Sequence, residues 1–133
     1  MQTSASKILS RTSLASNTAP ELLVRRLLHS LGFRFRLHVK SLPGTPDILL
    51  PKYKKIILVN GCFWHAHPCP RGNRLPKSNT PYWRAKRSRN HARDLRTRRQ
   101  LRSLGYSTLT LYECQLHNLP RLARRLTTFL HAP

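Results

Sequence analysis

Acidic residues are scarce in this chain of 133 residues: four Asp and Glu stand against 25 Lys and Arg, and the formal net charge is +21. A balance this basic indicates a polyanionic partner, and arginine in particular suits contacts with phosphates and bases. We therefore expect nucleic acid as the partner. Composition alone leaves one alternative, a basic protein of a membrane surface or of the ribosome.

Long hydrophobic runs are also absent. The longest, "IILV" at 56–59, is far shorter than the roughly 20 residues of a membrane span, so we expect a soluble protein without membrane contact. The opening "MQTSASKILSRTSL" has no continuous apolar region of the kind that directs secretion. With three cysteines, an odd number, the chain is expected in a reducing, cytoplasmic compartment, associated with the nucleoid of a bacterial-type cell.

Periodicity and turn residues predict a flexible arm over residues 1–17 and a single domain over 18–133. The expected order is helix, three strands, helix, strand, helix, which indicates an α/β fold with a mixed central sheet flanked by helices. The elements are a helix capped by Thr18 and ended by Gly32, strands at 33–40, 47–50 and 54–60, a helix from a Thr80 cap to about Leu104, a strand at 106–114 and a helix at 119–131.

The alternation in "FRFRLHVK" at 33–40 predicts a strand with one buried face and one positive face. The strand at 54–60 is apolar enough to be a buried, central one.

The stretch "GCFWHAHPC" at 61–69 holds metal-ligating residues at close spacing. Cys62, His67 and Cys69 can supply three ligands of a tetrahedral zinc site from one loop. Cys114 is the expected fourth, because it ends the last strand, which a central sheet can bring beside this loop. The alternative is that the cysteines are small buried hydrophobic residues.

His65 is left over once such a zinc site is complete. A histidine beside a zinc-stiffened loop is a candidate general base, because its ordinary pKa near 6.5 suits proton transfer. A solvated surface imidazole is the other interpretation.

Each carboxylate in a polyanion-binding protein repels the ligand, so one near the binding site needs a reason. Holding Mg²⁺ against phosphates is such a reason. Asp47, in "PGTPDILL", has the arrangement of the first half of a PD-(D/E)xK nuclease motif, but "LVNGC" stands where the second half would be.

Four ordered blocks over about residues 17 to 116 carry a family resemblance. They are "NTAPELLVRRLLHSLGFRFRLH", "LPGTPDILLPKYKKIILVNGCFWHAHPC", "YWRAKRSRNHARD" and "LGYSTLTLYEC". The chain resembles the very short patch repair DNA mismatch endonucleases, and "GCFWHxHxC" followed by a distant "EC" is highly specific for them. The resemblance implies a restriction-endonuclease-like fold and a nick 5′ to the thymine of a T:G mismatch in double-stranded DNA, the lesion left when 5-methylcytosine deaminates.

The resemblance also implies roles for residues of this chain. Asp47 and the backbone carbonyl of Val59 would hold Mg²⁺, His65 would be the general base, and Glu21 would position metal-bound water. Zinc would be structural, held by Cys62, His67, Cys69 and Cys114. Phe63 and Trp64, with Trp83, would wedge into the base stack, and Asn90 and Arg93 would contact DNA or support the site, as would Asp94.

Two departures from the family pattern bear on activity. Asn60 stands where some members carry histidine, and the arm before Asn17 matches poorly. A zinc-stabilised DNA-binding protein without cleavage, or a nuclease of the same fold with another mismatch preference, therefore stay as alternatives. The resemblance implies a monomer.

Overall fold

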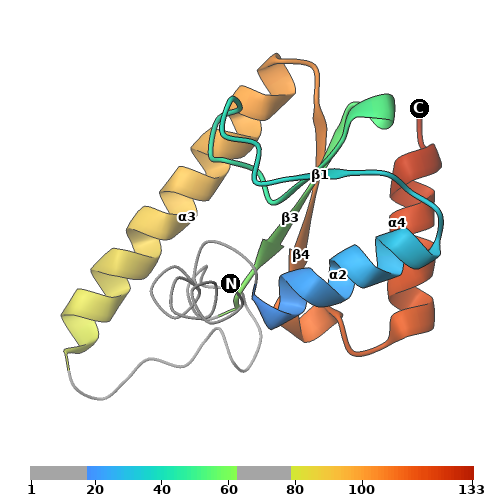
Figure 1. Ribbon diagram of the computed structural model, residues 1–133. Coiled ribbons are helices and arrows are strands. Elements are labelled where there is room, and N and C mark those ends of the chain that lie inside the picture. The colour runs from blue at the N-terminus through green and yellow to red at the C-terminus, as the bar shows by residue number, and fades with distance from the viewer. Residues whose placement is uncertain (1–17, 63–78) are drawn as a thin grey trace, which may run out of the picture.

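Four strands form one mixed sheet with helices on both faces (Figure 1). The computed structural model describes residues 18–62 and 79–133. Its elements are α2 (Ala19–Ser30), β1 (Arg36–Leu37), β2 (Ile48–Leu50), the 3₁₀ turn η1 (Pro51–Tyr53), β3 (Lys55–Asn60), α3 (Thr80–Ser103), β4 (Ser107–Tyr112), the 3₁₀ turn η2 (Glu113–Gln115) and α4 (Leu119–His131). The predicted order of helices and strands is confirmed. The expected arm, residues 1–17, lies outside the described residues.

The strands lie side by side in sequence order, β1-β2-β3-β4. The pairs β1–β2 and β2–β3 are antiparallel, and β3–β4 is parallel, with Asn60 beside Tyr112 at the carboxyl ends. The parallel pair requires a long crossover, and α3 lies within it. The prediction of a mixed α/β sheet is thus confirmed.

The core has two parts because both faces of the sheet are covered. α2 and α4 lie on one face and α3 on the other (Figure 1). Ile48, Leu50 and Ile57 join the larger cluster with α2 and α4, while Leu49 and Ile56 join the smaller one with α3. Successive side chains of a strand point to opposite faces, so strands buried on both faces have continuous apolar runs.

Helix α2 begins and ends at the predicted signals. The Thr18 hydroxyl accepts a hydrogen bond from the Glu21 backbone N–H at 3.4 Å, as an N-cap does. At the other end Gly32 has φ of +87°, and Phe33 donates its N–H to the Leu28 carbonyl at 3.0 Å. This pattern is a Schellman termination, which glycine adopts without strain.

Two predictions about local structure are wrong. Thr80 is the first residue of α3 and not its cap, since Asn79 occupies the N-cap position. The strand predicted at 33–40 is only Arg36–Leu37, and both of its residues are exposed. The physical reason is His38, whose φ of +47° breaks the extended chain. Phe33 and Phe35 consequently pack on the larger cluster, whereas Val39 packs on the smaller one on the other face.

The remaining elements agree with the sequence. β3 lies inside the sheet, with its first half buried, and α4 has the predicted bounds. The buried Lys55 links these two elements: its ammonium donates to the carbonyls of Phe129 and Ala132, the second at 2.5 Å. Among the described residues, no helix has the length and apolarity that crossing a membrane requires.

Candidate functional site

Asp47 lies immediately before β2, at the point where β2 and β3 diverge. Its Oδ2 accepts a hydrogen bond from the backbone N–H of Val59 at 2.9 Å. Its backbone carbonyl accepts from the His38 N–H at 3.1 Å. The carboxylate is thus fixed by β3 and the backbone of Asp47 by the residue that follows β1, which is how a ligand or catalytic side chain is preorganised.

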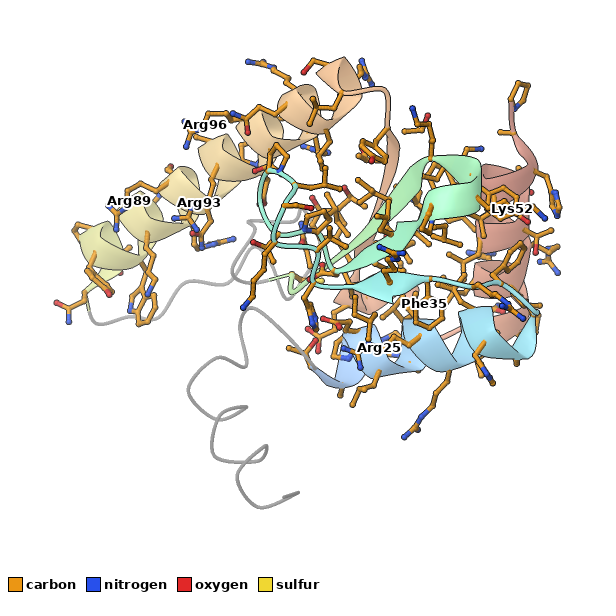
Figure 2. The ribbon with its side chains drawn as sticks, turned by 45° about the horizontal axis from the view of Figure 1, so that its top comes forward. Arg25, Phe35, Lys52, Arg89, Arg93 and Arg96 are labelled. Carbon is orange, nitrogen blue, oxygen red and sulfur yellow. The ribbon has the colours of Figure 1, made fainter. Side chains whose placement is uncertain are left out.

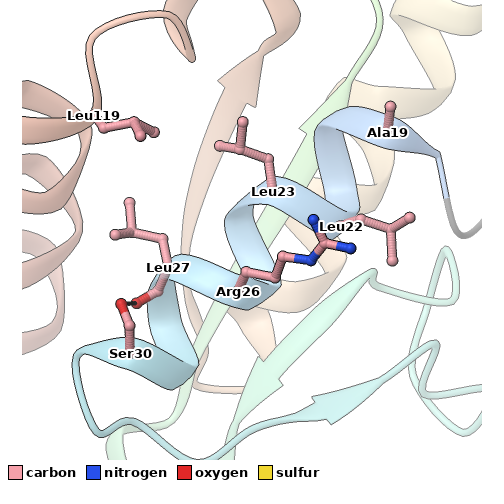
Figure 3. Close-up of a pocket in the computed structure, with 7 residues that line it drawn as sticks. All are labelled: Ala19, Leu22, Leu23, Arg26, Leu27, Ser30 and Leu119. Carbon is pink, nitrogen blue, oxygen red and sulfur yellow. Dashed lines mark hydrogen bonds between the residues drawn. The ribbon is translucent and has the colours of Figure 1, made fainter.

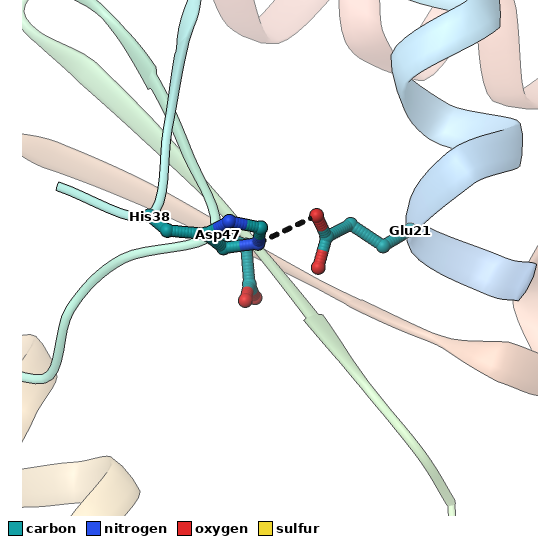
Figure 4. A group of neighbouring side chains, drawn as sticks. All are labelled: Glu21, His38 and Asp47. Carbon is teal, nitrogen blue, oxygen red and sulfur yellow. Dashed lines mark hydrogen bonds and ion pairs between the residues drawn. The ribbon is translucent and has the colours of Figure 1, made fainter. Parts of the chain in front are cut away.

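Glu21 and His38 lie beside Asp47 (Figure 4). The three side chains each offer one ligand atom, and these atoms all lie within 4.8 Å of one another. Glu21 comes from the first turn of α2 and is only 2% exposed, whereas His38 and Asp47 are half-buried. The cluster therefore joins the amino end of α2, the turn after β1 and the start of β2.

The Glu21 carboxylate has two basic partners. His38 Nε2 lies 2.8 Å from Oε2, and the Arg25 guanidinium donates to the same oxygen. A buried carboxylate requires such partners because burial of an unpaired charge is costly. The imidazole and the guanidinium therefore fix the orientation of Glu21 toward Asp47.

The donor set of this cluster fits a divalent cation. Two carboxylates within 4.8 Å repel each other unless a proton or a cation lies between them. Carboxylate oxygens are the ligands that Mg²⁺ and Ca²⁺ prefer, and an imidazole is added in sites for transition metals. Asp47 and Glu21 are both predicted site residues, and the fold brings them together.

His38 is the residue that the sequence interpretation missed. The apolar alternation predicts a regular strand at this residue, whereas its left-handed backbone turns the imidazole toward Glu21. The sequence holds no signal for this turn, because the apolar alternation over residues 33–39 continues without a break on both sides of His38.

Cys62 and Cys114, two of the predicted zinc ligands, are neighbours. The Cys114 backbone N–H donates to Cys62 Sγ at 3.4 Å, and Cys62 is fully buried. Parallel pairing explains the contact, because β3 and β4 end side by side and the two cysteines follow those ends. The other predicted ligands, His67 and Cys69, lie outside the described residues, as do Phe63, Trp64 and His65.

The remaining predicted DNA-binding residues are on α3. Trp83 is half-buried and its ring meets that of Tyr82 edge to face, with centroids 5.1 Å apart. Asn90 is half-buried, whereas Arg93 is exposed and lies with Arg89 and Arg96 along the outer side of the helix (Figure 2). This arrangement is compatible with phosphate contact by Arg93.

Asn60, the departure from the family pattern, contacts the end of β4. Its side chain hydrogen-bonds that of Tyr112, the residue beside it in the parallel pair. Burial raises the pKa of Tyr112 above its ordinary value of 10.0, although the nearby Arg98 and the bond with Asn60 act in the opposite direction. Asn60 therefore joins the carboxyl ends of the two strands.

A largely aliphatic hollow of about 510 Å³ lies between α2 and the start of α4 (Figure 3). Leu23, Leu27 and Leu119 line it, with Arg26 and Ser30 at its rim. It contains none of the carboxylates or histidines of the cluster. We therefore assign no chemistry to it.

Comparison with known proteins shows which family this chain resembles. The family model described as DNA mismatch endonuclease Vsr matches residues 2–71. A relative from Xanthomonas oryzae pv. oryzae, type II nicking enzyme V.XorIIP, is 47% identical over 87% of this chain and 85% of its own. Type II nicking enzyme V.NmeAIP of Neisseria meningitidis is 40% identical, over 84% and 79%. DNA mismatch endonuclease Vsr of Escherichia coli is 35% identical, over 89% and 75%.

The range that the family model matches includes Glu21, Asp47 and Cys62. The chain belongs to the DNA mismatch endonuclease Vsr family, and it is accordingly a DNA endonuclease, a hydrolase.

Proposed function

We propose that this protein nicks one strand of double-stranded DNA 5′ to the thymine of a T:G mismatch, by Mg²⁺-dependent hydrolysis of a phosphodiester. The single observation that carries the proposal is the pairing of Glu21 and Asp47. The whole chain has four acidic residues, and two of them converge within 4.8 Å in a protein of net charge +21. Two carboxylates next to a DNA-binding surface oppose binding unless they hold a cation.

The geometry around Val59 supports its carbonyl as a further ligand. Within a strand, the N–H and C=O of one residue point to the same edge. The Val59 N–H donates to Asp47, so its carbonyl faces the same side. Continuing the β2–β3 register puts Pro46 opposite Val59, and proline has no N–H to donate to that carbonyl.

In this proposal Asp47, Glu21 and the Val59 carbonyl would hold Mg²⁺, which would stabilise the charge that develops on the scissile phosphate. Asp47 is kept in place by the Val59 N–H, and Glu21 is kept in place by Arg25 and His38 while it orients the attacking water. His65 takes a proton from that water as general base. This role of His65 rests on the family resemblance alone.

We also propose a structural zinc site of Cys62, His67, Cys69 and Cys114 within a single restriction-endonuclease-like domain over residues 18–133. The bond from the Cys114 backbone N–H to Cys62 Sγ supports the site, because it makes these two expected ligands neighbours although they are 52 residues apart in the sequence. Phe63, Trp64 and Trp83 would intercalate beside the mismatch, with Asn90 and Arg93 as further contacts. The proposed active form is a monomer.

Mismatch recognition by this chain is inferred from its membership of the DNA mismatch endonuclease Vsr family and from its similarity to the Escherichia coli mismatch endonuclease. The experiment compares T:G, U:G and fully paired duplexes with Mg²⁺, and it measures nicking of each strand. We expect a nick in the T-containing strand of T:G only, and retained binding without nicking for Asp47→Asn. Equal nicking of all duplexes would contradict T:G specificity. Tight binding without any nicking would mean that the protein binds DNA and does not cleave it.

A further inference from the structure

The outer edge of β4 carries unpaired backbone groups in the part of the chain that the structure describes. β4 ends the sheet order and pairs with β3 on one side. Ser107 donates its N–H to the Lys54 carbonyl at 3.2 Å, so alternate residues from Ser107 onward face β3. The N–H and C=O groups of Thr108 and Thr110 therefore point away from the sheet.

A groove of about 490 Å³ runs along this edge. Thr108 and Thr110 form its floor, and Arg98, Arg99 and Arg102 of α3 form one wall. Arg125 of α4 lies at the other wall, where it donates to Gln115 Oε1 at 3.1 Å. The open edge is thus lined by guanidinium groups on both sides.

Gln115 marks where the open edge ends. The same Oε1 accepts from the Tyr112 backbone N–H at 3.0 Å, which satisfies the next outward-facing donor after Thr110. A second hollow, on the α4 side, shares Leu109 and Arg125 with the groove and adds Phe129. One wall is therefore cationic, and the other combines apolar surface with several arginines, because Arg121 and Arg124 also line the second hollow.

Basic side chains beside an edge strand protect it from pairing with similar chains. The same guanidinium groups attract an edge of opposite charge, and Asp94, whose charge acts on the groove residue Tyr112, offsets only part of theirs. Of its four acidic residues, Glu21 and Asp47 belong to the site cluster. This shortage also argues against a second copy of the chain as the occupant.

We propose that the groove binds an extended acidic segment of another protein, which adds a strand along the outer edge of β4. An added strand supplies both N–H and C=O groups. It can therefore form hydrogen bonds with the carbonyls and with the N–H groups of Thr108 and Thr110. The phosphates of DNA offer acceptors only and leave the two threonine carbonyls without donors. In an added strand, alternate side chains would face Arg98, Arg99 and Arg102, and the others would face Leu109 and Phe129.

The first test uses the unaltered protein and capped eight-residue peptides that alternate valine with glutamate or with lysine. We expect the glutamate peptide to bind and the lysine peptide not to bind, in fluorescence anisotropy. Two versions of the glutamate peptide, N-methylated at odd or at even residues, block one strand edge each. One of the two should lose about tenfold or more in affinity, since a buried carbonyl is left unpaired. Equal affinity of the two, or no binding of any, would overturn the proposal.

The second test uses variants. Thr110→Pro removes an outward N–H without touching the bonds to β3, and proline is tolerated at such edge positions. The variant should have about tenfold lower affinity for the glutamate peptide, while its thermal unfolding and mismatch nicking stay unchanged. The charge test compares two double variants. Arg99→Gln/Arg102→Gln removes two charges from the groove, and Arg89→Gln/Arg96→Gln removes the same number from the outer side of α3 (Figure 2).

Only the groove double variant should bind the glutamate peptide more weakly. Both double variants should bind a fully base-paired DNA duplex more weakly, to the same small extent, because phosphate contacts depend on total charge. If the groove double variant selectively loses affinity for the duplex and keeps its affinity for the peptide, the groove is a DNA contact and the proposal fails. Mismatch nicking is measured on the same variants. Nicking that is retained while peptide binding fails would overturn this proposal and leave the proposed catalytic function standing.

Discussion

Asp47 closes the gap between β2 and β3 by accepting the Val59 backbone N–H through Oδ2, at 2.9 Å. The antiparallel ladder stops after the Ile48–Ile57 pair, and Pro46 follows on the β2 side. The aspartate side chain thus takes the acceptor position that a backbone carbonyl would fill in a longer ladder. The same residue is both a structural bridge and the expected cation ligand, and the two roles can be separated by substitution.

Asp47→Asn and Asp47→Ala should differ in stability. Asparagine keeps a side-chain oxygen that can accept the Val59 N–H, whereas alanine leaves this donor without its partner. We expect Asp47→Ala to lower the free energy of unfolding by about 1–3 kcal/mol more than Asp47→Asn. Urea unfolding in EDTA measures the difference, and nicking should be lost in both. Equal stabilities would mean that the bond to Val59 contributes nothing.

His38 should affect the cation requirement through Glu21. In the His38→Ala variant, Arg25 is the one of these two basic partners that the Glu21 carboxylate keeps. We expect the guanidinium to pull this carboxylate away from Asp47. Groups that orient a ligand contribute roughly 10–100-fold to metal affinity. We expect the Mg²⁺ concentration for half-maximal nicking to rise about tenfold, with mismatch binding in EDTA unchanged.

Two variants control this experiment. His38→Gln keeps an amide N–H that can donate to Glu21 and should restore most of the Mg²⁺ response. His29→Ala removes an exposed histidine from the same part of the chain and should have no effect. A reduced maximal rate with an unshifted Mg²⁺ midpoint would show that His38 does not act through the cation site.

Zinc should be present at about one equivalent per chain and should be lost on substitution of a neighbouring thiol. Cys114→Ser replaces a thiolate by a poor zinc ligand beside Cys62. We expect elemental analysis of the variant to give little zinc, and thermal unfolding to occur at a lower temperature, because ligand binding to a structural site contributes to folding. Folded, freshly purified parent protein without zinc would contradict the proposed site.

The parts of the fold that follow from local rules were predictable. Thr18 and Gly32 fixed the ends of α2, and the apolar strand Lys55–Asn60 indicated a central position. The meeting of Cys62 with Cys114 also followed, because parallel strands bring their carboxyl ends together. These features depend on capping, hydrophobic period and chain direction, and all three are visible in the sequence.

The part that failed depends on a backbone conformation without a sequence signature. His38 has a positive φ, which is uncommon outside glycine, although histidine is among the residues enriched there. Its conformation is determined by contacts with residues distant in sequence, namely Glu21 and the Asp47 carbonyl. Alternation of Phe33, Phe35, Leu37 and Val39 therefore predicted a regular strand where the chain turns between the two faces.

Gly44 should tolerate alanine less well than Gly32. Both have positive φ, at +74° and +87°, so both substitutions incur the same kind of backbone strain. A Cβ on Gly44 would lie 2.4 Å from Cγ2 of Thr97 on α3, whereas one on Gly32 would meet nothing within 4 Å. We expect Gly44→Ala to cost about 1–3 kcal/mol more in the free energy of unfolding.

Urea unfolding of the two glycine variants measures this difference. The double variant Gly44→Ala/Thr97→Ser removes the Cγ2 methyl and should recover part of the loss. If Gly44→Ala and Gly32→Ala are equally stable, the turn before Asp47 does not pack tightly on α3.

Tyr112 should make the stability of the protein fall at high pH. Burial raises its pKa above 10.0, so the folded chain retains the phenolic proton more strongly than the unfolded chain does. This contribution is fully present below pH 10.0 and is lost as the pH rises through the folded value, because the unfolded state releases its proton first. Tyr112→Phe removes the titration, and its free energy of unfolding should decline less than that of the parent between about pH 9 and about pH 11.

The comparison must be made between variants, since lysines and other tyrosines titrate over the same range. Tyr82→Phe, at a residue that is 52% exposed, is the matched control for the loss of a tyrosine hydroxyl. At neutral pH, Tyr112→Phe should still be less stable than the parent, because Asn60 loses its side-chain partner at the end of β4. A profile of Tyr112→Phe that runs parallel to the parent over the whole range would mean that the phenol at the carboxyl ends of β3 and β4 titrates as it does in the unfolded chain.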